Sequence, residues 1–164
     1  MADDSDVELQ SYKTYDNVLL FSPQVSVPAD NFKTDKLIQY FDDGHNIFVA
    51  ADQLTKKHTW NLLLNFGIEI FPQDNVMKDG TPTPAEYVNL SGERNNVILS
   101  DNLFDPIRST IADINDPVVY HGVGARLDSE NDYVFPILSA SESTYNSDDK
   151  AKLFGSDITL AAGY

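Results

Sequence analysis

The first half of the chain alternates short apolar segments with amphipathic segments, and this order constrains the fold more than any other feature. Strand-length apolar runs alternate with stretches that show helical periodicity and end in glycine. The segments in chain order are 18–21, 34–44, 46–52, 53–67 and 68–72. Short strand–helix–strand connections favour right-handed parallel crossovers. The sequence therefore predicts an α/β fold: a layered, mostly parallel sheet with helices on its faces.

The opening strand has the pattern of an interior strand. Val18, Leu19, Leu20 and Phe21 are continuously apolar, which is typical of a strand whose two faces are both covered by helices. Such strands rarely begin a domain. A final apolar strand over 158–164 also runs directly into the last residue. We therefore expect a domain that is truncated at both ends.

The second half of the chain predicts a less regular, β-rich region. Residues 1–14 are interpreted as an acidic lead-in, and 15–164 as one domain whose second half becomes irregular from about residue 72. A polar loop is predicted over 142–157, and a helical turn over 107–111. The strand candidates are 86–90, 95–100, 117–127, 133–141 and 158–164.

Composition excludes several classes of protein. Lys and Arg number 11 against 26 Asp and Glu, so the formal net charge is -15. This balance argues against nucleic acid or an anionic membrane surface as a partner, because both require clustered basic residues. The absence of cysteine excludes disulfides and thiolate chemistry. No stretch approaches the roughly 20 apolar residues that cross a bilayer, and Met1 is not followed by a basic and then apolar leader.

His121 is the strongest candidate for chemistry, because it stands beside Gly122 and Gly124 in a possible anion-binding turn. The third glycine and the strand-to-helix context of a dinucleotide site are missing, so a structural turn is the favoured interpretation. His45 and His58 have no metal-ligand spacing with His121 or with each other. The sequence thus predicts no metal site and no cofactor.

Other polar residues form a weaker set of candidates. In a parallel sheet, ligands bind outside the carboxyl ends of the strands, which makes Ser22, Asp52 and Ser100 ligand-face candidates together with His121. Ser22 lacks the flanking glycines of a nucleophile elbow. Asn89 begins an Asn-Leu-Ser glycosylation acceptor pattern, which has meaning only in the secretory pathway. No catalytic constellation is predicted.

Five segments, in order, resemble the lumenal domain of the forty-eight-kilodalton subunits of the eukaryotic oligosaccharyltransferase. They are "ADDSDVELQSYKTYDNVLLFSP", "LIQYFDDGHNIFVAAD", "GIEIFP", "DPVVYHGVGARLDSENDYVFPILSASESTYN" and "ITLAAGY". The resemblance implies a non-catalytic accessory or scaffold role in the en bloc transfer of a dolichol-linked oligosaccharide to Asn-X-Ser/Thr. It also implies the lumenal side of the endoplasmic reticulum membrane, with elements before and after these residues, including a C-terminal membrane segment, that this chain lacks.

The resemblance further implies the partners: the catalytic subunit, ribophorin-like subunits and small membrane subunits of the same complex. The resemblance assigns no catalytic residue to this sequence. Two other hypotheses stay open at this stage. One is a free-standing flavodoxin-like domain that binds a small molecule at Ser22, Asp52 and Ser100. The other is a hydrolase or glycosyltransferase that uses His121 with a carboxylate.

Overall fold

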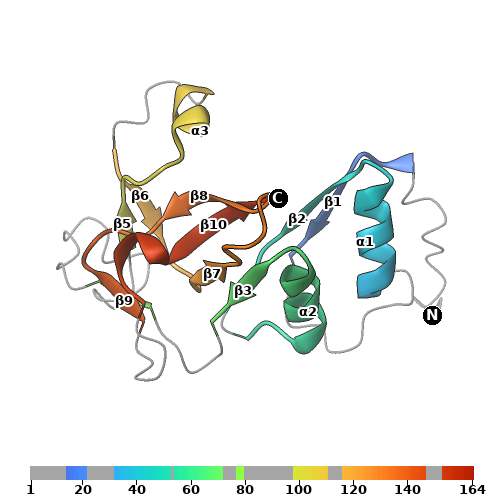
Figure 1. Ribbon diagram of the computed structural model, residues 1–164, viewed down its shortest axis with the longest axis horizontal. Coiled ribbons are helices and arrows are strands. Elements are labelled where there is room, and N and C mark those ends of the chain that lie inside the picture. Colours follow the sequence, from blue (N-terminus) through green and yellow to red (C-terminus); the bar gives the residue numbers. More distant parts are fainter. Residues whose placement is uncertain are drawn as a thin grey trace, which may run out of the picture. The chain divides into compact units, whose positions relative to one another are not determined.

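The computed structural model describes residues 14–21, 32–52, 54–71, 77–79, 98–110, 116–146 and 153–164 (Figure 1). The chain divides into two compact units, Met1–Asn65 and Phe66–Tyr164. No helix among the described residues is long and apolar enough to span a lipid bilayer. Each unit is described in turn.

The first unit is a strand–helix–strand–helix unit, as predicted. Its elements are β1 (Asn17–Leu20), α1 (Thr34–Asp42), β2 (Asn46–Val49) and α2 (Lys57–Asn65). Strands β1 and β2 pair in parallel, with Leu19 opposite Phe48. The apolar runs and the helix between them therefore form the expected crossover.

The prediction that helices cover both faces of β1 is not met in the described residues. Leu19, Phe21 and Phe48 are each more than half exposed, whereas Val18 and Ile47 on the opposite face are partly buried. The rings of Phe21 and Phe48 lie 5.7 Å apart between centroids. We call Leu19, Phe21 and Phe48 the exposed β1–β2 face.

Gly44 terminates helix α1, as predicted, in a Schellman motif two residues after Asp42. The amide of Gly44 donates to the carbonyl of Phe41, and the amide of His45 donates to that of Tyr40, at 2.8 and 3.4 Å. This geometry needs the positive φ of Gly44, +94°. The N-cap is Lys33, so Thr34 is the first residue of the helix and does not cap it.

The Thr34 hydroxyl instead lies 3.3 Å from Nδ1 of His58 on α2. Burial lowers the pKa of His58, and a hydrogen bond with the backbone of Phe32 opposes this only in part. The fold therefore favours the neutral imidazole. When the pH falls below the ordinary pKa of His58, the unfolded chain takes up the proton first, and this unit becomes less stable.

Helix α2 is shorter than the predicted segment 53–67. Thr59, Leu62 and Leu63 are its buried residues, while Leu64 on the helix and Leu54 before it are exposed. Trp60 is only partly buried, although its indole nitrogen is buried without a hydrogen-bond partner. Trp60 thus packs only partly into the interior of this unit.

The second unit is built on an antiparallel sheet. Its four strands lie in the order β3 (Ile68–Ile70), β7 (Ala125–Leu127), β10 (Thr159–Gly163) and β8 (Phe135–Ser139). Figure 1 shows β10 between β7 and β8. The flavodoxin-like, mostly parallel sheet is therefore not confirmed, because the main sheet is antiparallel and, among the described strands, only β1 and β2 pair in parallel. A mixed α/β class is confirmed.

The described residues of the second unit also form two antiparallel strand pairs and a short helix, α3 (Asp105–Thr110), between β5 and β6 in the sequence. The pairs are β4 (Met77–Asp79) with β9 (Thr144–Asn146), and β5 (Ile98–Ser100) with β6 (Val118–Tyr120). Strand β9 and a 3₁₀ turn (Gly155–Asp157) lie where a polar loop was predicted. The predicted strand 117–127 is two strands, β6 and β7, in different sheets. The predicted strand 86–90 lies outside the described residues.

The core of this unit joins the main sheet to the β5–β6 pair. Its buried members come from β5, β8, β10 and the adjoining segments: Phe71, Ile98, Leu138, Ala140, Ile158 and Leu160. Full burial of one such Ile or Leu side chain stabilises a fold by about 1.5–3 kcal/mol. The apolar runs predicted as strands thus supply the core, although their pairing differs from the prediction.

Candidate functional site

The predicted ligand-face residues do not form a site among the described residues. Ser22 and Asn89 lie outside the described part of the chain. Asp52 belongs to the first unit, and Ser100 and His121 to the second. Each of these last three has a local structural role or a surface position of its own.

Asp52 organises the turn that leads into α2. Its Oδ1 accepts a hydrogen bond of 2.7 Å from the amide of Leu54. Its own amide donates to the Thr55 hydroxyl at 2.8 Å, and the amide of Thr55 donates back to the Asp52 carbonyl at 3.1 Å. This is an Asx turn, which explains the carboxylate at this position without a ligand.

Ser100 is a buried structural residue. Its side chain is 1% exposed, donates to the carbonyl of Ser139 on β8, and accepts from the amide of Asn102 at 3.1 Å. The Asn102 side chain continues this link by donating to the carbonyl of Ala140 at 2.8 Å. The hydroxyl therefore fastens the end of β5 to β8 and presents no group to a ligand.

His121 is exposed in the turn between β6 and β7, so the structural interpretation of this turn fits its geometry. The hydroxyl of Tyr120 closes the turn by donating to the carbonyl of Val123 at 2.5 Å. Burial of this phenol raises the pKa of Tyr120 to about 12. No carboxylate among the described residues pairs with His121, and no cluster of three His, Asp or Glu side chains there could hold a metal ion.

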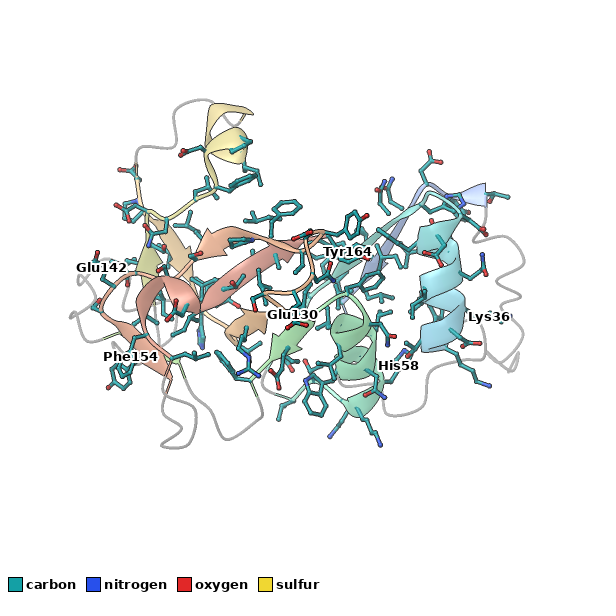
Figure 2. The ribbon with its side chains drawn as sticks, in the orientation of Figure 1. Lys36, His58, Glu130, Glu142, Phe154 and Tyr164 are labelled. Atoms are coloured by element: carbon teal, nitrogen blue, oxygen red, sulfur yellow. The ribbon has the colours of Figure 1, made fainter. Side chains whose placement is uncertain are left out.

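The most distinctive surface of the second unit is aromatic. Phe66, Tyr133 and Tyr164 meet from three distant parts of the chain, with ring centroids 5.0 Å apart for Phe66–Tyr164 and 6.1 Å apart for Tyr133–Tyr164. Tyr133 is 73% exposed and Tyr164 45% exposed. We call these three residues the aromatic surface. Figure 2 labels Tyr164, a member of this surface, and Glu130, which lies in the turn that precedes Tyr133.

A rigid turn positions Tyr133. Oδ1 of Asp128 accepts from the amide of Glu130 at 3.0 Å, and Oδ1 of Asn131 accepts from the amide of Tyr133 at 3.1 Å. The amide of Asp128 donates to the carbonyl of Gly67 at 2.8 Å, which anchors the turn next to Phe66. Consecutive Asx turns of this kind fix the backbone without help from a sheet.

Sequence reasoning missed the aromatic surface. A local signal existed for Tyr133, since Asn131 two residues before it is the pattern of an Asx turn. The meeting of Phe66, Tyr133 and Tyr164 depends on the pairing of β3 with β7 and of β7 with β10, which no local pattern encodes.

Comparison with known proteins identifies the family. The whole chain, residues 1–164, matches the family described as OST48, N-terminal domain. The chain belongs to this family. The resemblance seen in the ordered segments of the sequence is thereby confirmed.

Relatives of this OST48 N-terminal domain chain carry the name dolichyl-diphosphooligosaccharide–protein glycosyltransferase 48 kDa subunit. The chain is 27% identical to that of Drosophila melanogaster and 24% identical to that of Arabidopsis thaliana, over 99% of its own length in both cases. It is 26% identical to that of Danio rerio over 88% of its length. It spans 37% of the first relative and 39% of the second.

The fold has a solved counterpart. The mmIFT52 N-terminal domain superposes with a TM-score of 0.60 and 16% sequence identity, over 92% of this chain and 71% of the other. This similarity establishes a shared fold. It supports the mixed α/β class of the OST48 N-terminal domain chain.

Proposed function

We propose that this chain is part of a non-catalytic accessory subunit of the oligosaccharyltransferase, at the lumenal side of the endoplasmic reticulum membrane. The observation that carries the proposal is the match of the entire chain to the OST48 N-terminal domain family. In this role the subunit supports the en bloc transfer of a dolichol-linked oligosaccharide to Asn-X-Ser/Thr, and another subunit performs the chemistry.

The placement of the polar residues supports a non-catalytic role. Asp52 and Ser100 are engaged in a turn and in a strand contact, and no described carboxylate is paired with exposed His121. A general acid or base must lie within hydrogen-bonding reach of its partner. The free-standing ligand-binding hypothesis finds no support in these positions either.

The exposed β1–β2 face supports a role in assembly. Leu19, Phe21 and Phe48 lie together on one side of a two-stranded sheet, and contiguous exposed apolar side chains mark binding surfaces. We therefore propose that this face contacts another subunit, such as the ribophorin-like or catalytic subunit.

Purification of the tagged full-length subunit from its own host tests the proposal. We expect mass spectrometry to recover the catalytic and ribophorin-like subunits. The triple variant Leu19→Thr, Phe21→Thr, Phe48→Thr should lose at least one partner, since threonine retains strand propensity but removes apolar area. Phe154→Thr, which alters an exposed aromatic residue of the other unit, is the control. Recovery of no oligosaccharyltransferase subunit from intact microsomes would refute the proposed function.

A further inference from the structure

We propose that the aromatic surface, Phe66, Tyr133 and Tyr164, binds the sugar rings of a neutral oligosaccharide. This inference rests on the proposed function for the kind of ligand that the subunit meets. The evidence for the surface itself is geometric and electrostatic. It comes entirely from the second unit of the chain.

The rings are positioned for stacking and remain accessible. Phe66 and Tyr164 meet edge to face, at 64° between ring planes, and Tyr133 and Tyr164 are tilted by 45°. Part of each ring remains accessible on Tyr133 and Tyr164, which are largely or partly exposed. The C–H face of a pyranose is apolar, and it packs against an aromatic ring through dispersion and weak C–H contacts.

The surface is organised before any ligand arrives. Asn131 and Asp128 fix the turn that carries Tyr133, and the carbonyl of Gly67 holds that turn from the β3 side. Little conformational entropy is lost when such a residue is covered, because its backbone is already fixed. A weak ligand such as a sugar benefits most from this preorganisation.

Charge around the rings disfavours anionic ligands. The turn exposes the carboxylates of Asp128, Glu130 and Asp132 and carries no basic residue. The neighbouring basic side chain of Arg126 is already paired with Glu69. Carboxylates accept hydrogen bonds from sugar hydroxyls but repel a diphosphate, so the geometry favours the saccharide part of a glycan.

The same charges argue against a protein partner at this place. Asp and Glu are depleted in the cores of protein–protein interfaces, where their desolvation is costly. Here three carboxylates lie within residues 128–133, the six-residue stretch that also presents Tyr133. A hydroxyl-rich ligand that keeps these carboxylates hydrated and hydrogen-bonded fits the surface better.

Saturation-transfer-difference NMR on the full chain tests the proposal. The probes are mannotriose, chitotriose and maltotriose, with inorganic pyrophosphate in a competition arm. We expect at least one sugar to bind through its ring C–H protons, and Tyr133→Ala to weaken it by about five-fold or more, as loss of an aromatic contact predicts. Tyr133→Phe, which keeps the ring, should retain most of the affinity.

Phe154→Ala is the matched control. Phe154 is 54% exposed, belongs to the same unit, and lies at the far end of that unit from Tyr164 in Figure 2. Its loss should leave sugar affinity unchanged. The proposal is overturned if no sugar binds, if Phe154→Ala and Tyr133→Ala weaken binding equally, or if pyrophosphate displaces the sugar. Self-association of the chain that Tyr133→Ala abolishes in sedimentation would also overturn it, in favour of a second copy.

These outcomes are independent of the purification experiment. Lost sugar binding with an intact set of co-purified subunits overturns the sugar surface alone. Retained sugar binding with no co-purified subunit overturns the proposed function alone.

Discussion

Tyr120 combines a core contact, a turn-closing hydrogen bond and a raised pKa in one side chain. Its ring packs against the core of the second unit, and its hydroxyl donates to Val123 across the turn that holds His121. A methyl group on Gly122 would lie 2.7 Å from that hydroxyl, which is why a residue without a side chain follows His121. The turn is thus shaped by Tyr120 and not by the histidine.

Tyr120→Phe should lower the free energy of unfolding by about 1 kcal/mol at pH 8, the usual contribution of one buried hydrogen bond. The pKa of this phenol is about 12 in the fold against an ordinary value of 10.0. The stabilisation is therefore complete below pH 10 and is lost as the pH rises towards 12, because the unfolded chain ionises first. Urea unfolding between pH 8 and 11.5 should show the difference between wild type and variant shrinking.

Val118→Ala provides the control for this pH dependence. Val118 lies on the same strand and packs against the same core, but it has no ionisable group. Its destabilisation should stay constant over the same pH range. A Tyr120→Phe difference that is equally constant would contradict the assigned role of the phenol.

At the scale of elements, two glycines allow the energetic cost of backbone strain to be compared with the cost of steric crowding. Gly44 and Gly67 both have positive φ, +94° and +77°. A Cβ on Gly44 would meet nothing within 4 Å, whereas one on Gly67 would lie 2.9 Å from Nδ2 of Asn131. Both positions end helices, so their sequence signals are identical.

Gly44→Ala should destabilise its own unit by about 1 kcal/mol, the cost of a positive φ for an L-residue. Gly67→Ala should cost its unit about 1 kcal/mol more, since overpacking adds to strain and displaces the side chain that holds Tyr133. Hydrogen exchange read by mass spectrometry on peptides of each unit gives the two values separately. Equal costs would mean that Asn131 moves aside freely.

The accuracy of the sequence predictions follows the range of the interactions. Helices α1 and α2 and strands β1, β2 and β3 were predicted because glycine ends and apolar runs are local signals. The antiparallel pairing of β3 was not predicted, because its partner β7 lies far along the chain. Strands β4 and β9 are three residues each, Met-Lys-Asp and Thr-Tyr-Asn, and they carry no apolar alternation that could have revealed them.

At the scale of the whole molecule, charge is the dominant feature. A formal charge of -15 on 164 residues causes self-repulsion in the compact state. The ion pair Glu69–Arg126 is exposed and contributes little against it. The fold must therefore rely on its apolar core.

Screening should consequently stabilise the chain. We expect the melting temperature to rise when NaCl increases from about 0.01 M to 0.1 M, a change that shortens the Debye length from about 30 to 10 Å. For a chain of this size, each kcal/mol corresponds to about 2–4 °C. Differential scanning fluorimetry provides the measurement. Repeating it at pH 5, closer to the pI of 4.2, should give a smaller rise. A fall at pH 7 would show that attractive pairs outweigh the repulsion.

The position of β10 has a consequence for synthesis on the ribosome. Strands β7 and β8 both pair with β10, so the main sheet has no continuous ladder until Thr159–Gly163 has left the exit tunnel. Synthesis proceeds at about 5–20 residues per second, so the edges of β7 and β8 that pair with β10 stay unpaired for several seconds until β10 emerges. During that interval the nascent chain exposes unpaired strands, which makes it a natural client for chaperones in the compartment where it emerges.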